Sequence, residues 1–504
     1  MANNETRQPP ENGDATTISQ KSAFTSPLLI TALLITGAIA IWGLVDTAGL
    51  AAKAAQLVHV QFVSRAWFVM LAVSFMLIVS IWLALSRYGG IKLGMDDDEP
   101  EFSTISWLTM LFAAGMGVGL LFWGTAEPLT HFDLARQYSI PGQAANSALF
   151  VTNFHWGLHA WAIYALTGLV IAYFGFRRGC PSLIGSPIID TFGSNRVTNI
   201  VGWSSNLLAI VAIAIGVGGS IAMGVFQVKD GIDTLFNLSG TGLGLTTVVF
   251  FVLCAAYFPP LVVDLSTGMA KLSNTAMAVA GALLIFILLA GPTHYLMGGI
   301  TSAIGEYFSK VLAHGFRTYT FMDEHIGSWF QSWTLTYMVW WIAWAPFVGV
   351  FIARISRGRT IREFIFGVIL GPTVFSMLWF GIFGGAGFYA VLQGGSEIMD
   401  VVRNNVSAVT FFMLDNYPLP TITISLVIVA AFLFIVTSVV SAAFVLGMFS
   451  TEGDLNPSAK IKLIWGVILG ALGYVMILSG DMSAIKSIIA LGSLPFVFVV
   501  LILV

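Results

Sequence analysis

Residues 112–128 read FAAGMGVGLLFWGTAEP, and this stretch lies inside a longer apolar segment. Gly115, Gly117 and Gly119 follow one another at every second position, with Met116 among them. Each glycine in a helix interior costs about 1 kcal/mol relative to alanine, so we expect the helix to loosen or break here. In a membrane, unwound backbone is tolerated where it lines a cavity, and half-helix ends there bind ions and charged groups. The stretch therefore predicts the floor of a binding site that includes Met116, Gly117 and Gly119. The alternative is a glycine seam that packs two membrane helices closely.

The composition of the chain places it in a membrane. It has 504 residues, of which 57% are hydrophobic and 9% are charged, and its mean hydropathy is +0.88. Soluble globular proteins of this length do not approach these values, so we predict an all-α polytopic membrane protein. Phosphate-binding loops, nucleophile elbows and metalloenzyme signatures are absent from the sequence. We therefore expect no enzyme activity, no cofactor and no nucleic-acid partner.

Twelve apolar segments have roughly the length that crosses a membrane. They lie near residues 28–46, 66–87, 103–128, 147–175, 200–226, 242–262, 274–297, 332–354, 361–390, 420–448, 460–480 and 484–504. If the N-terminus is inside, the inner loops and span ends carry fourteen of the 22 Lys and Arg residues, and the outer side carries the other eight. This bias predicts that both termini are cytoplasmic in a plasma (inner) membrane protein.

Two further segments lie outside the predicted spans. Residues 1–27 are polar and lack the apolar core of a signal peptide, so we expect a disordered cytoplasmic tail. Residues 298–331 mix apolar and charged side chains, which predicts an amphipathic segment along the outer surface.

Three aromatic residues share one face of the fourth segment, which reads FHWGLHAWAIYAL over residues 154–166. If this segment is one regular helix, Trp156, Trp161 and Tyr164 fall within an arc of about 140°. A single tryptophan in a membrane protein ordinarily belongs to an interfacial belt. A cluster well inside a span favours a binding site instead.

The eighth segment carries a second aromatic cluster, Trp340, Trp341 and Trp344, shortly before Pro346. We expect this proline to break the helix. Tryptophan faces attract quaternary ammonium groups by a cation–π interaction worth on the order of 2 kcal/mol per contact when desolvated. Together the two clusters predict a box of rings that binds a cationic group without a carboxylate.

Charged residues are nearly absent from the middles of the predicted spans. A site of rings and glycines suits a zwitterion, since a free cation such as choline favours a buried carboxylate partner. The acid closest to the membrane is Glu127, beside Pro128 at the outer end of the third segment. We interpret it as a helix-end residue that reaches interfacial water, with ion coupling as the alternative.

Hydroxyl side chains in the tenth segment suggest a cation site. Thr437 and Ser438 are adjacent there, and such residues ordinarily bond to their own helix backbone. If this segment faces the broken third segment, the two hydroxyls and the carbonyls of Ala113 and Met116 would provide the oxygen ligands that a small monovalent cation prefers. Both readings remain open from the residues alone.

His155 and His159 are one helical turn apart, a spacing that can hold a metal ion. We found no Cys, Asp or third His near them in the sequence, so we interpret both as packing residues.

A run of four arginines follows the eighth segment. Its members are Arg354, Arg357, Arg359 and Arg362. We expect them to anchor an inner-surface helix to anionic lipid headgroups, with a contribution to gating as a further possibility.

These stretches resemble the betaine/choline/carnitine transporter family over nearly the whole chain, from about residue 28 to 504. The most specific matches are AAGMGVGLLFWGTAEP at 113–128, FHWGLHAWAIYAL at 154–166 and WWIAWAPFVGVFIARISRGRTIREF at 340–364. The resemblance implies a homotrimer and a LeuT-type core of two inverted five-helix repeats. The implied parts are two peripheral helices in 28–102, a first repeat in 103–297, the outer segment 298–331 and a second repeat in 332–504.

The resemblance also implies site residues. In similar transporters the substrate box matches Trp156, Trp161, Tyr164 and Trp341, with Trp340 and Trp344 along the pathway. In sodium-coupled betaine carriers one ion site matches Ala113, Met116, Phe434, Thr437 and Ser438. Choline carriers resemble one another in having an aspartate where this chain has Gly119, which agrees with a zwitterionic substrate.

Some positions depart from the family pattern. The second sodium site of those carriers uses two threonines in the fifth segment, where this chain has Ile213 and Val217. The aspartate that usually follows the Thr-Ser pair corresponds to Val440, and the loop at 258–274 also differs. We therefore expect one coupling ion instead of two.

The leading hypothesis is a secondary transporter that imports a small zwitterion such as glycine betaine, driven by sodium. A proton-coupled or exchange carrier for carnitine, choline, dimethylsulfoniopropionate or ectoine is the alternative within the class. A channel or a membrane receptor that uses the same pocket is the alternative from another class. In each case we expect membrane lipids and further copies of the chain as partners.

Overall fold

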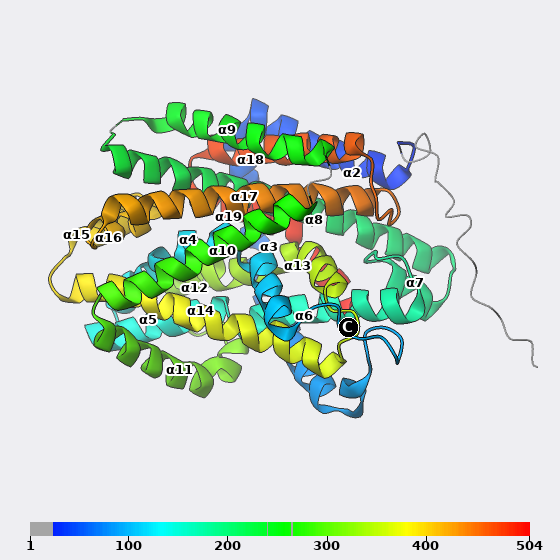
Figure 1. Cartoon of the computed structure of the whole chain (residues 1–504), viewed down its shortest axis with the longest axis horizontal. Helices are drawn as coiled ribbons and strands as arrows, with labels where there is room; N and C mark the ends of the chain where they lie inside the picture. The colour runs from blue at the N-terminus through cyan, green and yellow to red at the C-terminus, as the bar shows by residue number, and fades with distance from the viewer. Residues whose placement is uncertain (1–23, 239, 264–265) are drawn as a thin grey trace, which may run out of the picture.

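The computed structural model describes residues 24–238, 240–263 and 266–504, without the side chains of 112–116 and 266–270. Most of the predicted tail 1–27 therefore lies outside the described residues. The described chain is helical, and its long helices lie side by side along the long axis of the molecule (Figure 1). Within the described part, the isolated bridge between Lys92 and Thr360 is the one β pairing.

The helices of the first half of the chain are α2 (Pro27–Val45), α3 (Thr47–Leu85), α4 (Thr104–Ala135), α5 (Pro141–His155), α6 (Leu158–Ala172), α7 (Ser186–Phe192), α8 (Arg196–Phe236), α9 (Gly242–Val262) and α10 (Ser266–Ala290). Those of the second half are α11 (Thr293–Gly315), α12 (Glu324–Phe330), α13 (Thr336–Arg354), α14 (Ile361–Leu392), α15 (Glu397–Asn404), α16 (Val409–Asp415), α17 (Pro420–Ser450), α18 (Ala459–Ser479), α19 (Met482–Ser493) and α20 (Phe496–Leu503). Short π-helical turns, Tyr173–Arg177 and Gln331–Leu335, extend α6 and precede α13.

The helices are long and apolar enough for a polytopic membrane protein. Among the described residues, ten helices could cross a membrane, and α19 with α20, bent by 47° to one another, would make an eleventh. The predicted span near 103–128 coincides with α4, in which five side chains are not described. The total of twelve spans and the inverted repeat stay predictions.

The core of the molecule surrounds α8. Every residue from 209 to 225 in this helix is buried. A helix that is apolar on all sides needs neighbours on all sides, and α8 is packed against α13, α17, α18 and α19. Helix α8 is therefore the central helix, and the other helices pack around it.

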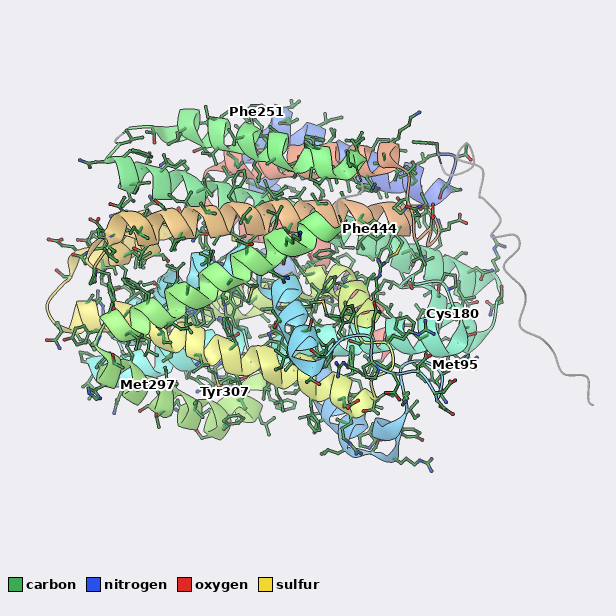
Figure 2. The ribbon with its side chains drawn as sticks, viewed as in Figure 1. Met95, Cys180, Phe251, Met297, Tyr307 and Phe444 are labelled. Atoms are coloured by element: carbon green, nitrogen blue, oxygen red, sulfur yellow. The ribbon has the colours of Figure 1, made fainter. Side chains whose placement is uncertain are left out.

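Loops predicted to be inside and loops predicted to be outside lie toward opposite ends of the molecule. Helix α7 lies at one end of the long axis, and α15 and α16 lie at the other (Figure 1). Met95 and Cys180 come from loops predicted to be inside, and they lie at the same end of the molecule as α7. Met297 of α11 lies toward the opposite end (Figure 2). Which end faces the cytoplasm stays a prediction.

The predicted amphipathic segment 298–331 is mainly helical. It covers most of α11 and all of α12. The buried residues of α11 recur every three or four positions, which gives one buried face on a helix with an exposed opposite side. They are Leu296, Ile300, Ala303, Tyr307, Val311 and His314. Its position on the outer surface of a membrane stays a prediction.

One expectation about the eighth segment is wrong. Helix α13 continues through Pro346 to Arg354, so this proline does not end it. Three arginines of the run, Arg354, Arg357 and Arg362, are exposed, and their contact with lipid headgroups stays a prediction, whereas Arg359 does not face outward. Arg359 is buried over the ring of Trp107 and donates to the carbonyl of Phe102 at 2.7 Å. Arg362 donates to the carbonyl of Ala84 at 2.7 Å.

Candidate functional site

Helix α4 is broken at one residue of the glycine stretch. Gly117 has φ 46° and ψ −154°, a conformation outside the helical region and accessible mainly to glycine. The break predicted from the sequence is thus confirmed, and it falls at the middle glycine. The side chains of the predicted residues Ala113 and Met116 lie outside the described residues.

A second break separates α5 from α6, and it corrects the prediction of one continuous helix there. Trp156 has φ −113° and ψ 8°, and Gly157 has φ −107° and ψ −144°. A Cβ on Gly157 would lie 2.2 Å from the Tyr307 hydroxyl oxygen and 2.4 Å from the Asn153 carbonyl oxygen, so only glycine fits. The Tyr307 hydroxyl accepts a hydrogen bond from the backbone N–H of Leu158 at 2.8 Å. The arc computed for a regular helix therefore does not apply to Trp156.

A cavity lies between these breaks, α8, α13 and α17. Its empty volume, mouth included, is about 630 Å³. Its floor includes Gly117 and Gly119, as predicted for a binding-site floor. A Cβ on Gly119 would lie 3.1 Å from Cη2 of Trp156, so the glycine lets this ring approach the backbone closely. The remaining walls are mostly aromatic and aliphatic. They are formed by Val118, Trp123, Trp156, Tyr164, Val217, Ser220, Ile221, Met223, Tyr337, Trp340, Trp341, Trp344, Ile435, Ser438 and Val439.

Trp341 is the centre of the aromatic wall. Its ring centroid lies 5.0 Å from that of Tyr164, 5.4 Å from that of Trp156 and 5.9 Å from that of Trp161. The structure thus brings together rings from the α5–α6 break, α6 and α13. These rings pack in contact with one another, and three of them, Trp156, Tyr164 and Trp341, line the cavity with electron-rich surface.

The predicted ring residues differ in their access to the cavity. Trp156, Tyr164, Trp340, Trp341 and Trp344 line it. Trp161 does not, because it is fully buried behind Tyr164 and Trp341. It acts on the cavity only through the rings it supports.

Polar side-chain groups occur among the lining residues of this largely apolar space. They include the hydroxyls of Tyr164, Ser220 and Ser438 and the indole N–H of Trp344, which has no hydrogen-bond partner in the described part of the protein. These groups can donate hydrogen bonds to an anionic end of a ligand.

Ser438 of α17 lies beside the break in α4. A Cβ on Gly117 would lie 3.9 Å from Oγ of Ser438. Thr437 instead donates to the carbonyls of Leu433 at 3.0 Å and Phe434 at 3.1 Å, which is the ordinary arrangement for such residues. The structure therefore places one hydroxyl of the predicted pair at the break, and a cation site that uses both stays a prediction.

The corresponding part of α8 offers no such oxygen. Ile213 and Val217 are buried, and Val217 lines the cavity. The next hydroxyl along the helix is that of Ser220. This agrees with the expectation of a single cation site.

The interpretation of Glu127 as a helix-end residue in interfacial water is wrong, because Glu127 is fully buried. One carboxylate oxygen, Oε2, accepts hydrogen bonds from Trp156 Nε1 at 2.8 Å and from the Tyr337 hydroxyl at 2.5 Å. The other, Oε1, contacts Nδ1 of His155 at 2.7 Å and Nε2 of His131 at 3.4 Å. One carboxylate thus fixes two rings that line the cavity.

The histidine at position 131 also corrects the reading of His155. A third histidine is near after all, one turn beyond Glu127, and the ligand atoms of Glu127, His131 and His155 lie within 4.8 Å of one another. The hydrogen bonds argue against a metal, however. Nδ1 of His131 accepts from Trp329 Nε1 at 3.2 Å, so its Nε2 carries the hydrogen and donates to Glu127. We interpret these residues, called the Glu127 cluster below, as a hydrogen-bonded network.

Lys486 is a second exception to the expected absence of buried charge. This residue of α19 is 8% exposed, and its Nζ lies 3.3 Å from the ring centroid of Trp333 and 4.9 Å from that of Trp123. The sequence-based reading placed it at an outer span end. Neither Lys486 nor His131 carried a sequence signal of its own, since the contacts that define them come from distant helices.

Comparison with known proteins now decides the class. The family model described as "BCCT, betaine/carnitine/choline family transporter" matches residues 27–504. The chain belongs to this family. It is a transporter and not an enzyme.

Individual relatives cover most of this BCCT transporter. It is 40% identical to the glycine betaine transporter OpuD of Bacillus subtilis, over 84% of this chain and 82% of that protein. It is 37% identical to a probable glycine betaine transporter of Desulfitobacterium hafniense, over 84% of each chain. It is 33% identical to an ectoine/hydroxyectoine transporter of Virgibacillus pantothenticus, again over 84% of each.

Proposed function

We propose that this transporter imports glycine betaine or a closely related zwitterion across the plasma (inner) membrane, coupled to sodium. The observation that carries the proposal is the cavity, in which aromatic faces surround a glycine floor. A quaternary ammonium has no N–H to donate, so it gains most from such faces. The named activities of the relatives from Bacillus and Desulfitobacterium support the same substrate class.

The two ends of a zwitterion fit different parts of the cavity. The cationic head packs against Trp156, Tyr164 and Trp341. The ring centroid of Trp341 lies 5.4 Å from that of Trp156 and 5.0 Å from that of Tyr164. The carboxylate accepts hydrogen bonds from the groups on the other walls, namely Ser220, Ser438 and the Trp344 indole. With Gly119 in the floor, the ligand itself supplies the anionic group, and a net cation gains no acidic partner there.

Sodium binds, in this proposal, beside the break in α4. The ligands are the hydroxyls of Thr437 and Ser438 with the carbonyl of Phe434 and those of the backbone at Ala113 and Met116. Hard oxygens of this kind suit a small cation, and half-helix ends supply them in membrane proteins. We further propose that the protein is a homotrimer with both termini in the cytoplasm.

Ectoine is a second candidate because one of the relatives is named for it. Its ring is a delocalised cation with N–H groups, so it needs acceptors as well as aromatic faces. The hydroxyls of the cavity can donate to a carboxylate and also accept from an N–H, so they suit both solutes. The names of two relatives favour glycine betaine over ectoine.

The test is direct binding followed by transport. Purified protein is titrated with glycine betaine, dimethylsulfoniopropionate, carnitine, choline and ectoine by tryptophan fluorescence, with and without sodium. We expect the tightest binding for glycine betaine in the presence of sodium. Counterflow in proteoliposomes then separates a carrier from a channel or a receptor. Tighter binding of ectoine would move the substrate assignment, and sodium-independent uptake would remove sodium coupling.

A further inference from the structure

The ammonium of Lys486 already occupies aromatic faces at one side of the cavity. Its Nζ lies 3.3 Å from the centroid of Trp333, 4.9 Å from that of Trp123 and 5.9 Å from that of Tyr337. Among the described residues, no carboxylate lies within the 4.0 Å of an ion pair from this ammonium. The rings therefore take the place of a counter-ion, which is the function predicted for the rings of the cavity itself.

Two of these rings belong to both sites. Trp123 and Tyr337 contact Lys486, and both also line the cavity. Trp333 lies behind Tyr337, with the two rings nearly parallel at 14° and their centroids 6.1 Å apart. Rings that also belong to the cavity wall thus separate the amine of Lys486 from the cavity.

Two acids belong to this region. Glu127 of α4 accepts a hydrogen bond from the Tyr337 hydroxyl, and Asp481 caps the start of α19. The proton arrangement of the Glu127 cluster contributes to the charge of this region. When the amine of Lys486 is protonated, Lys486→Met lowers that charge by one unit.

We propose that Lys486 determines substrate specificity by excluding ligands with a net positive charge. The inference rests on the proposed function, because it concerns the choice between a zwitterion and a cation in the same cavity. A net cation is repelled by the ammonium and competes with it for the faces of Trp123 and Tyr337. A zwitterion has no net charge, so the same ammonium costs it little.

The size of the effect follows from the separation. Two unit charges about 10 Å apart at an effective dielectric constant of about 20 interact strongly enough to change an affinity on the order of tenfold. Lys486→Met keeps the length of the side chain and removes the charge, whereas Lys486→Arg keeps the charge. We expect Lys486→Met to raise the ratio of choline affinity to glycine betaine affinity about tenfold, and Lys486→Arg to leave it near the wild-type value.

The experiment measures binding of choline and glycine betaine to the full-length protein by tryptophan fluorescence, or by calorimetry where Trp333 quenching interferes. Lys310→Met, on the exposed side of α11, is the matched control. Lys486→Gln provides a second neutral variant if the methionine variant is not folded. An unchanged ratio in a folded neutral variant that still binds glycine betaine overturns this inference alone. A wild-type protein that binds neither compound overturns the proposed function, and this inference with it.

Discussion

The cavity and the Glu127 cluster share Trp156 and Tyr337 but are built from opposite materials. The cavity is lined mainly by rings and aliphatic side chains, with a few hydroxyl and indole N–H groups among them. The cluster beside it concentrates a buried carboxylate, two histidines and two ring donors around one point. A binding surface made of neutral rings needs its orientation fixed from behind, and hydrogen bonds to a buried acid provide this. The difference indicates that recognition and positioning are separated in this site.

The largest expected effect tests the proposed cation site beside the break in α4. Thr437→Ala combined with Ser438→Ala removes the two proposed hydroxyl ligands, so we expect loss of sodium-dependent uptake. In the wild type, a single site predicts a hyperbolic dependence of uptake on sodium. Uptake into proteoliposomes over a range of sodium concentrations measures both. A Hill coefficient near two would contradict the single site.

Glu127→Gln tests the positioning half of the comparison. The amide can accept from only one oxygen and brings two donors toward Trp156, Tyr337 and His155. Hydrogen bonds to a buried charged group contribute about 1.5–3 kcal/mol each, so we expect the loss of one to weaken binding roughly 10- to 150-fold. Titration with glycine betaine measures the affinity, and thermal unfolding in detergent reports stability. Glu306→Gln, on the surface of α11, is the matched control. Wild-type affinity in the Glu127 variant would show that the rings hold their places without it.

Trp341→Ala tests the recognition half. It removes the ring that contacts Trp156, Trp161 and Tyr164, and the expected loss is about 2 kcal/mol, or roughly 30-fold in affinity. Trp465, fully buried in α18 and hydrogen-bonded to Ser450, offers a control for the general cost of removing a buried tryptophan. Thermal unfolding identifies variants that lose stability instead of the site. Unchanged affinity in a folded Trp341 variant would place the substrate elsewhere.

Gly119→Asp tests the absence of charge from the floor. The new carboxylate would repel that of a zwitterion, so we expect glycine betaine to bind roughly tenfold more weakly and choline to gain. A Cβ at position 119 would lie 3.1 Å from the Trp156 ring. Gly119→Ala is therefore the control, because it adds this crowding without the charge. Equal losses in both variants would assign the effect to crowding.

The smallest expected effect concerns the loop between α3 and α4, far from both regions. Hydrogen bonds from the Arg357 guanidinium hold the pKa of Asp98 below its usual range. A lowered folded-state pKa means that the stabilisation is present above the unfolded value, about 4, and is lost only as the pH falls below it. We therefore expect hydrogen exchange in this loop to show the same protection at pH 7 and pH 5 after correction for intrinsic rates. Asp98→Asn should remove part of that protection at both values.

The fold class and the walls of the cavity could be predicted from the sequence, because they depend on local signals. The glycine stretch predicted the break that occurs at Gly117, and ring clusters predicted which residues would line a cavity. Predictions failed where a residue's role depends on distant partners. Glu127 is surrounded by residues 28 and 210 positions away in the chain, and Lys486 by rings from α4, from α13 and from the π-helical turn before α13. A hydropathy pattern does not predict that a single charged residue at the end of a span is buried.

The hydrogen bond between the Tyr307 hydroxyl and the start of α6 links helix α11, at the surface, to the centre of the protein. Helix α11 lies at the edge of the molecule (Figure 2), yet its Tyr307 hydroxyl accepts the N–H of Leu158, two residues after Trp156. Gly157 leaves no slack there, because its neighbours already lie within van der Waals contact of where a side chain would begin. Helix α11 is therefore joined by a direct hydrogen bond to the break that carries Trp156, so the position of this helix and the position of the ring are mechanically linked.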